Sequence, residues 1–311
     1  MKFPRATRPE SGPPGFVRGA HSNMRPYRDD GVLGSLAADL ADFAVVPFVG
    51  AGCSLGLTKE ADWKAVTDVL AGGLELVEWT SETVVAQTYE DRFGREALVT
   101  ALRERLTLSA FDDERGATHL ALLCLHFPAI YTTNVENAIE LGHTKYGRPL
   151  NVVSELNDLR NVVPGRTVLY KYHGDLQHPA NLVWTEGDYA RRKAREDFVL
   201  NVRLRSDLLT KKLLFVGYSV RDPHIVELLA MAQRLYADGI RGGVVIAAGK
   251  VDPVVKTEFR DFVRWFSFLA SAYRRCSLVF GSPAIDAVFR CCRIRCRSGA
   301  VVALHAANRI R

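Results

Sequence analysis

The chain has 311 residues, of which 48% are hydrophobic and 24% charged, with a formal net charge of +6. This is an ordinary composition for one large α/β domain or two modest ones, with a core that needs no disulfide staples. No apolar run reaches the roughly 18 to 20 residues that span a bilayer, and the first 30 residues lack the apolar centre of a signal peptide. We therefore expect a cytoplasmic protein without a membrane partner.

The positive charge is concentrated at the two ends of the chain. Residues 1–30 carry a net charge of +3 and residues 290–311 carry +6, which leaves residues 31–289 at −3. A slightly acidic body gives no electrostatic reason for the core to bind nucleic acid, so any such partner is expected to act indirectly. Solvated tails are the favoured interpretation of the basic ends, and phosphate contacts are the alternative.

Residues 1–30 are rich in Pro, Gly and Arg and show no apolar periodicity. This composition predicts a disordered basic N-terminal segment. Met24 within it is a hypothetical native start, which the intact mass of the endogenous protein would test. The folded domain is expected over residues 31–270.

From residue 34 onward, helical patterns alternate with short apolar strands. Strands are predicted at Val45–Val49, Ala129–Thr132, Thr167–Tyr172, Leu213–Val216 and Val244–Ala247. Helices are predicted at 34–43, 62–71, 95–106, 115–125, 134–142, 196–210, 222–237 and 256–270. This alternation predicts a Rossmann-like α/β fold, a doubly wound parallel sheet with helices on both faces. A helical insert is expected after the first strand, over about residues 62–125.

Residues 271–311 form an Arg/Cys-rich tail with no acidic residue after Asp286. A partner-binding tail, a divergent extension and a shifted reading frame are all compatible with its composition. The chain's six cysteines include no C-x-x-C pair, so they cannot build the two knuckles of a zinc ribbon. Scattered thiols are favoured over a metal site made by Cys291, Cys292, Cys296 and His305, and no zinc is expected.

Four of the five predicted strands run into glycine or polar residues. These clusters are Gly50-Ala51-Gly52-Cys53-Ser54, Thr132-Thr133-Asn134, His173-Gly174-Asp175 and Gly217-Tyr218-Ser219. In a parallel sheet the carboxyl ends of the strands share one edge, where ligands bind. The sequence therefore predicts one cleft lined by backbone amides, an amide side chain, an imidazole and hydroxyls.

Each cluster also has a purely structural interpretation. Gly50 and Gly52 are suited to holding a phosphate and equally to making a tight turn. Asn134 is placed either to cap the next helix or to hold water or a ribose hydroxyl, and Glu136 to accept from a carboxamide. His173 is favoured as a general base because three similar clusters adjoin it.

The cluster after the fourth apolar strand contains Gly217 and Ser219, which suit contact with a ribose. Asp222 and Pro223 follow, and this pair is typical of the start of a helix. For Asp222 the capping role is the preferred interpretation.

Taken together, the ordered motifs GAGxS, TTNxE, K-x-HGD and FVGYSxxD resemble those of Sir2-like (sirtuin-fold) domains. The similarity is greatest to the zinc-free branch found in bacterial antiphage systems, and it covers about residues 34–265. Two positions depart from the protein deacylases of the family. Glu136 stands where sirtuins have an aspartate, and Trp63 lies where deacylases carry a Phe-Arg pair.

The resemblance implies NAD⁺ as the substrate, with Asn134 and His173 as the catalytic pair. The residues that it implies in NAD⁺ binding are Gly50, Ala51, Gly52, Ser54, Thr133, Glu136, Gly217 and Ser219. Of these, the glycine turn would hold the pyrophosphate, and Gly217 and Ser219 the adenosine side.

The expected function is hydrolysis of the nicotinamide–ribose bond to nicotinamide and ADP-ribose, as an effector that depletes NAD⁺ in antiphage defence. Homo-oligomerisation or an activating partner protein is expected to control it. The alternatives are an NAD⁺-dependent protein deacylase or ADP-ribosyltransferase, or a catalytically silent NAD⁺ or ADP-ribose sensor. Free ADP-ribose as the product would distinguish the hydrolase from all of these.

Overall fold

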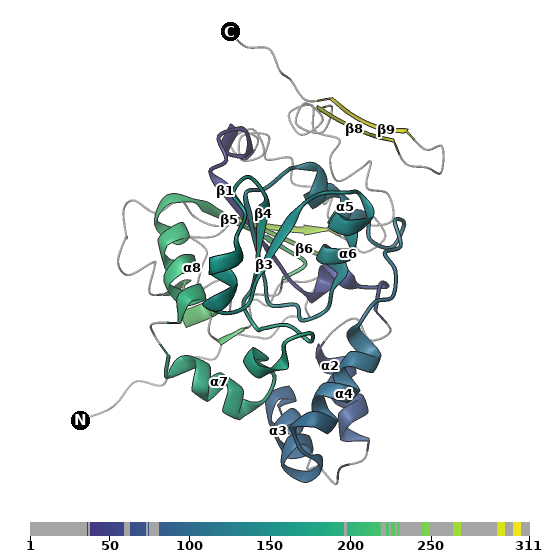
Figure 1. The fold of residues 1–311 in the computed structure, drawn as a ribbon, viewed down its shortest axis with the longest axis vertical. Helices are drawn as coiled ribbons and strands as arrows, with labels where there is room; N and C mark the ends of the chain where they lie inside the picture. Colours follow the sequence, from purple (N-terminus) through teal and green to yellow (C-terminus); the bar gives the residue numbers. More distant parts are fainter. Residues whose placement is uncertain are drawn as a thin grey trace, which may run out of the picture.

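Figure 1 shows the fold of the chain in a computed structural model. The structure describes residues 36–230, with gaps at 37, 59–62, 73, 75–80, 196–197, 219–221, 224 and 228, and then the backbones of residues 244–248, 264–268, 291–295 and 301–305. The predicted N-terminal segment, the helix predicted at 222–237 beyond residue 230 and most of the Arg/Cys-rich tail lie outside the described residues.

A seven-stranded sheet forms the centre of the fold. Its strands are β1 (Val45–Val49), β2 (Ala129–Thr132), β3 (Leu150–Val153), β4 (Thr167–Lys171), β5 (Lys212–Val216), β6 (Val244–Ala248) and β7 (Arg264–Phe268). The strand order is β3-β4-β2-β1-β5-β6-β7, and every neighbouring pair is parallel. The predicted α/β parallel sheet is confirmed, and all five predicted strands are present within one residue at each end.

Two strands of this sheet were not predicted. β3 is a four-residue edge strand with the sequence LNVV, too short to stand out from a loop. β7 lies inside the segment predicted as a helix at 256–270, so that prediction is wrong at its C-terminal end. The sequence of β7, RWFSF, is dominated by aromatic residues, which favour the pleated surface of a sheet over a helix. A separate antiparallel pair, β8 (Cys291–Arg295) and β9 (Val301–His305), lies within the tail.

The helices whose bounds the structure describes are α2 (Trp63–Ala71), α3 (Glu82–Phe93), α4 (Arg95–Leu106), α5 (Ala117–Cys124), α6 (Ala138–Lys145), α7 (Glu186–Lys193) and α8 (Val199–Thr210), with short 3₁₀ turns η1 (Ala51–Ser54), η2 (Asn157–Asn161) and η3 (Pro179–Asn181). Four of them, α2 to α5, lie between β1 and β2, which confirms the helical insert. The unpredicted helices α3 and α7 begin at side-chain caps, Ser81 for α3 and Thr185 in a capping box for α7.

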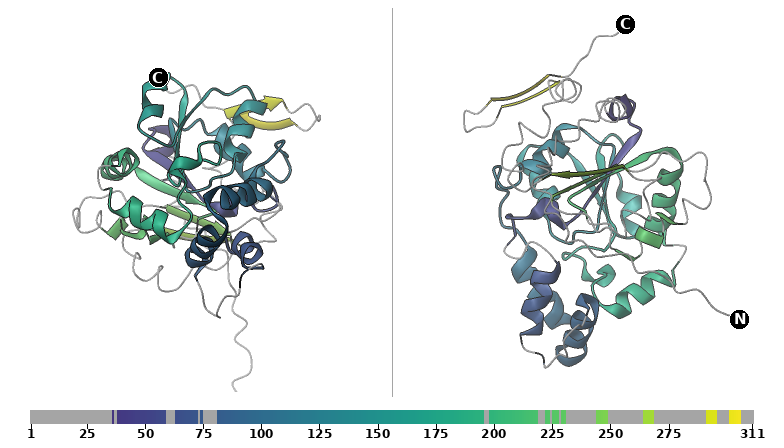
Figure 2. Two further views of the ribbon diagram at one scale, coloured as in Figure 1. Left: turned by 60° about the horizontal axis from the view of Figure 1, so that its bottom comes forward. Right: turned by 180° about the vertical axis from the view of Figure 1, so that it is seen from behind.

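Helices cover both faces of the sheet (Figures 1 and 2). In β5, Leu213 and Phe215 join a buried cluster with α8, whereas Leu214 and Val216 join a cluster on the other face with α5 and α6. Alternate residues of one strand thus face opposite layers, as the pleat requires. The near-continuous apolar runs of the strands follow from this double burial.

The first helices of the insert pack beside the chain that follows β4. Figure 1 shows α2, α3, α4 and α7 gathered beyond the end of the sheet. Apolar residues of α2 to α4, including Val66 and Leu98, share a buried cluster with Leu176, Leu182 and Trp184. The insert therefore supports the loop that carries the histidine motif.

Candidate active site

The four strand-end motifs lie side by side, as predicted. β4, β2, β1 and β5 are consecutive in the sheet. Thr132 pairs with both Val49 and Lys171, and Val49 also pairs with Val216, so the four strands end at the same level. Asn134 and His173 each follow a paired position by two residues, on neighbouring strands.

Three glycines allow the turns after β1 and β5 to meet. A Cβ atom on Gly50 or Gly52 would lie 2.6 or 2.7 Å from the Gly217 carbonyl oxygen, and one on Gly217 would lie 2.4 Å from the Cys53 amide nitrogen. Gly217 also has a φ of +62°, a left-handed conformation that favours glycine. The glycine spacing is therefore required by the contact between the two turns, whatever ligand they bind.

Hydrogen bonds of these turns already use several backbone amides. Gly50 N donates to Val216 O at 3.0 Å, Gly52 N donates to Gly217 O at 2.9 Å, and Cys53 N donates to Gly50 O at 3.0 Å. The Cys53 thiol donates to Val216 O at 3.1 Å. Burial, with a further contribution from the nearby Glu136 carboxylate, raises the pKa of this thiol well above its ordinary value. Cys53 is thus a packed structural thiol and not a nucleophile.

The β1 and β2 ends are joined by a compact polar network. Glu136 Oε1 accepts from Ser54 Oγ at 2.5 Å and from Asn134 Nδ2 at 2.9 Å, and Glu136 Oε2 accepts from Ala138 N at 2.5 Å. All three side chains are at least nine-tenths buried. The structure thus brings together Ser54, Asn134 and Glu136, which the sequence predicted from separate motifs.

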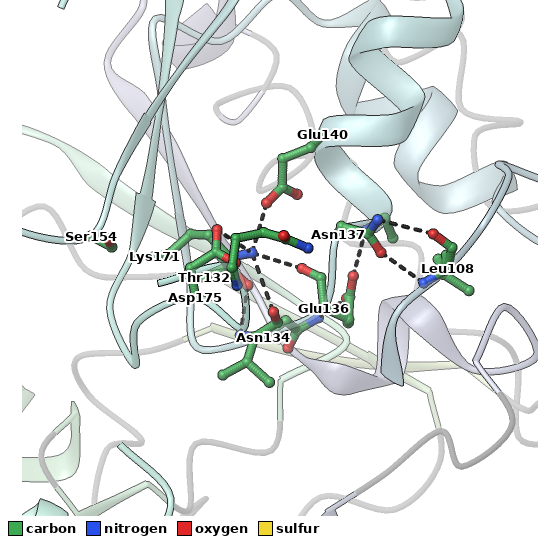
Figure 3. Close-up of polar contacts among 12 residues, drawn as sticks. Leu108, Thr132, Asn134, Glu136, Asn137, Glu140, Ser154, Lys171 and Asp175 are labelled. Atoms are coloured by element: carbon green, nitrogen blue, oxygen red, sulfur yellow. Dashed lines mark hydrogen bonds and ion pairs between the residues drawn. The ribbon is translucent and has the colours of Figure 1, made fainter. Parts of the chain in front are cut away.

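Asn134 does not cap the next helix, which corrects one of its two interpretations. α6 begins at Ala138, four residues later than predicted, and its N-cap position is Asn137. Asn137 turns its side chain to the backbone of Leu108 instead (Figure 3). Because the Glu136 carboxylate can only accept, it fixes the Asn134 NH₂ group toward itself. The Asn134 Oδ1 atom makes no hydrogen bond with the residues that the structure describes, so it can accept from a ligand.

Lys171 anchors this network, with its ammonium between Glu140 and the loop that carries Asn134 and Glu136 (Figure 3). Its fully buried ammonium contacts Glu140 Oε1 at 2.6 Å and Asp175 Oδ2 at 3.2 Å, and donates to Glu136 O at 2.8 Å. Burial alone would lower the pKa of Lys171, but the two carboxylates outweigh it and raise the pKa above its ordinary value. The lysine of the K-x-HGD motif therefore fixes the loop that carries Asn134, a role that sequence reasoning did not assign.

His119, on α5, lies behind Ser54. Its Nε2 atom is 3.5 Å from Ser54 Oγ, and burial lowers the pKa of its imidazole. His143, on α6, is also buried, and desolvation lowers its pKa as well. The Nδ1 atoms of both have no hydrogen-bond partner among the described residues. Both histidines line a cavity of about 10 Å³, which has room for one water molecule at most.

The β4 end presents His173. Its imidazole is 4% exposed, and Nε2 lies 3.0 Å from Asp222 Oδ2. The two atoms are within ion-pair distance but are not aligned as a directed hydrogen bond. Tyr189 Oη donates to the same carboxylate oxygen at 2.9 Å, and the Tyr189 ring meets the imidazole edge-on with centroids 5.4 Å apart.

An aromatic cluster continues from Tyr189 into the insert. Trp63, on α2, stacks on Tyr189 with ring centroids 5.9 Å apart and contacts Trp184 at 5.1 Å. The Nε1 atoms of both tryptophans are buried without hydrogen-bond partners in the part of the chain that the structure describes. Trp63, which stands at the departure from the deacylase pattern, thus packs against the group that contacts His173.

Several predicted site residues are not tested by this geometry. Ser219 lies outside the described residues. Ala51 and Thr133 are half-buried beside the network, and their expected contacts with NAD⁺ remain predictions. Asp222 does cap the following helix, since its Oδ1 accepts from Ile225 N at 3.2 Å, but it also contacts His173.

Within the described residues, no group of three or more His, Cys, Asp or Glu side chains is arranged to hold a metal ion. Cys291 pairs with His305 in the register of β8 and β9, but their side chains are outside the description, so both interpretations of the tail cysteines stay open. No helix in the described part of the chain has both the length and the apolar character of a membrane span.

Comparison with known proteins supports the resemblance that the motifs indicated. Residues 128–264 match the family model described as SIR2-like domain. The chain is 28% identical over 186 residues to "NAD(+) hydrolase ThsA" of Cytobacillus dafuensis, covering 59% of this chain and 37% of that protein. It is 27% identical to "NAD(+) hydrolase ThsA" of Enterococcus faecium, covering 59% and 38%. It is 26% identical to "Defense-associated sirtuin 2" of Bacillus subtilis, covering 62% and 20%. The match thus spans less than two fifths of each relative.

Proposed function

We propose that this chain, which carries a SIR2-like domain, is an NAD⁺ hydrolase that cleaves the nicotinamide–ribose bond to give nicotinamide and ADP-ribose. We propose further that it acts in the bacterial cytoplasm as an effector of antiphage defence. The observation that carries the proposal is the fixed Ser54–Asn134–Glu136 network beside His173, at the edge of the sheet where such ligands bind. The names of the relatives support the same reaction.

Asn134 and His173 are the two residues proposed to act on the reacting atoms. The Asn134 Oδ1 atom is left to accept from water or a ribose hydroxyl, because Nδ2 is held by Glu136 at 2.9 Å. His173 is the proposed general base, and it follows the strand that neighbours the one before Asn134. The fixed amide and the imidazole would thus approach the ribose from adjoining strand ends.

The remaining contacts with NAD⁺ are proposed for the turns after β1, β2 and β5. Because the amides of Gly50 and Gly52 donate within the protein, Ala51 and Ser54 are the members of the first turn best placed to meet the pyrophosphate. Thr133 and Glu136 would lie near the nicotinamide ribose. Gly217 and Ser219 would adjoin the adenosine side.

In the proposed reaction the C1′–N bond breaks first, and its electron pair leaves with nicotinamide. The ribose passes through an oxocarbenium-like state, as in glycoside hydrolysis, and a water oxygen then bonds to C1′. The proton released by that water goes to His173 and then to solvent. Nicotinamide needs no protonation to leave, so the site must orient the ribose, stabilise positive charge and place water. The mechanism requires no zinc.

Unrestrained NAD⁺ hydrolysis would harm the host cell, so the activity needs a restraint. We propose that assembly into a homo-oligomer or contact with an activating protein of the same system releases it. The match covers 37% and 20% of two of the relatives, so those proteins contain further regions that could control their activity.

The decisive test is nicotinamide release from NAD⁺, measured by chromatography. The purified protein is assayed by itself and together with the product of a neighbouring gene. Asn134→Ala and His173→Ala are each expected to lower the rate by about 10²- to 10⁴-fold, because a positioned catalytic group is lost. The matched controls Asn161→Ala and His178→Ala change the same residue types at exposed positions and should keep the parent rate. Parent rates in both site variants, or no release under either condition, would refute the proposal.

A further inference from the structure

Asp222 has a second role beyond the helix cap that its sequence position indicates. Its Oδ1 atom accepts from Ile225 N at 3.2 Å, which is the capping bond. Its Oδ2 atom lies 3.0 Å from His173 Nε2 and accepts from Tyr189 Oη at 2.9 Å. The Asp222 carboxylate therefore contacts both the start of a helix and the proposed general base.

The contact between His173 and Asp222 is almost fully excluded from solvent. The two side chains are 4% and 7% exposed, so water screens their interaction little. Burial, reinforced by the Asp222 carboxylate, raises the pKa of Tyr189 well above its ordinary value. Tyr189 consequently remains a protonated donor to Asp222 and holds the carboxylate in place.

We propose that Asp222 is a positioning residue for His173, an inference that rests on the proposed NAD⁺ hydrolysis. The carboxylate accepts from the Nε2–H group of the neutral imidazole, so Nδ1 is the atom that takes the proton from water. A small rotation of the imidazole aligns the 3.0 Å contact into that hydrogen bond, because catalytic hydrogen bonds often tighten only with substrate. When His173 receives the proton, the adjacent negative charge stabilises the imidazolium.

Tyr189 completes the arrangement by constraining both partners. Its hydroxyl fixes Asp222, and its ring borders the imidazole at an interplanar angle of 77°. Stacking on Trp63 fixes the tyrosine ring in turn. Removal of the hydroxyl alone should therefore loosen Asp222 while the imidazole keeps its aromatic neighbour.

The test compares Asp222→Asn with the parent protein. Asparagine keeps an oxygen for the Ile225 cap but offers an NH₂ group, which favours the wrong imidazole tautomer, with the proton on Nδ1. We expect kcat for nicotinamide release to fall by about 10²- to 10⁴-fold with little change in KM. Tyr189→Phe should show a smaller loss, Asp222→Glu a partial rescue, and the exposed Glu227→Gln no change.

A second measurement separates positioning from folding and does not depend on activity. The ¹⁵N chemical shifts of the His173 ring nitrogens should report the Nε2–H tautomer in the parent protein and the Nδ1–H tautomer in Asp222→Asn. If the parent protein releases no nicotinamide, the proposed function fails while the tautomer measurement still tests Asp222. If the parent protein is active and Asp222→Asn keeps both its rate and its tautomer, the inference about Asp222 is wrong and the proposed function stands.

Discussion

The ends of β2 and β4 adjoin in the sheet but differ in how their polar groups are satisfied. At the β2 end both carboxylate oxygens of Glu136 accept hydrogen bonds, and the Lys171 ammonium donates to the Glu136 carbonyl. At the β4 end His173 contacts Asp222 without a directed hydrogen bond. A carboxylate whose two oxygens both accept hydrogen bonds holds its neighbours in one arrangement, whereas an imidazole without a directed hydrogen bond can change its partner.

This difference suits the two strand ends to different catalytic roles. A fixed amide suits the task of holding water or a hydroxyl in one place, which lowers the entropic cost of reaction. An imidazole with a neighbouring carboxylate suits the task of moving a proton. The following predictions test this division, starting with the largest expected effect.

Lys171→Met should destabilise the protein most, by about 3 to 5 kcal/mol of unfolding free energy, because it leaves the partly buried Glu140 and the buried Asp175 without their cation. Urea unfolding measures the loss. The control is Lys64→Met, which breaks an ion pair of the same 2.6 Å length whose side chains are 69% and 63% exposed. That variant should lose no more than about 1 kcal/mol. If both variants lost the same unfolding free energy, the Lys171 ion pairs would stabilise the β2 end no more than an exposed ion pair does.

Gly217→Ala tests the close contact between the turns after β1 and β5, which lie next to the β2 end. Its methyl group would meet Cys53 N at 2.4 Å and would also carry the cost of a positive φ, so we expect a loss of about 2 to 4 kcal/mol. Gly147→Ala is a close control, because Gly147 has a φ of +61° but nothing within 4 Å of an added Cβ. It should lose only about 1 to 2 kcal/mol, the cost of the conformation alone. The difference between the two melting curves isolates the steric contact.

Acidification should destabilise the protein through His119 and His143, the buried histidines near the β2 end. Burial lowers the pKa of both His119 and His143 in the folded protein, so below a pH of about 6.5 the unfolded chain binds more protons than the folded one. The unfolding free energy should therefore fall as the pH falls, by at most about 1.4 kcal/mol per pH unit for each histidine. Urea unfolding at about pH 8 and about pH 5.5 should show a smaller fall in His143→Gln than in the parent. If the unfolding free energy of His143→Gln falls as much as that of the parent, His143 does not contribute to the pH dependence.

Ser54→Ala should have the smallest effect. It removes one of the donors to Glu136 Oε1 while Asn134 Nδ2 remains in place. We expect nicotinamide release to fall about tenfold, equivalent to about 1.4 kcal/mol. The exposed Ser206→Ala is the control and should keep the parent rate. A loss as large as that of Asn134→Ala would mean that Ser54 itself touches the reacting atoms.

The sequence predicted the strands and the shared edge because buried parallel strands are apolar runs with polar ends. It missed β7 because an aromatic segment was assigned a helical period, and it missed α7 because that helix is only eight residues long and its signal is a capping box. It could place Asn134 in the cleft but could not decide between cap and ligand contact. That choice depends on Glu136, which takes over the first amide of α6.

Other parts of the site depend on contacts between residues far apart in the chain. Lys171 and Glu140 are 31 positions apart, and no local pattern indicates that the buried lysine pairs with this glutamate. Asp222 has a complete local explanation as a cap, so nothing in its own segment points to His173. A residue with one satisfactory local role can thus conceal a second role that only the fold reveals.

The stacking of Trp63 on Tyr189 gives the site an intrinsic optical label. Trp63 and Trp184 are two of the four tryptophans of the chain, and their indoles lie 5.1 Å apart. Aromatic rings at this distance couple electronically, and Tyr189 links them to the His173 imidazole through a ring contact. We therefore expect a rearrangement around His173 to change the near-ultraviolet circular dichroism and the fluorescence of this pair, so that events at the site can be followed without an added dye.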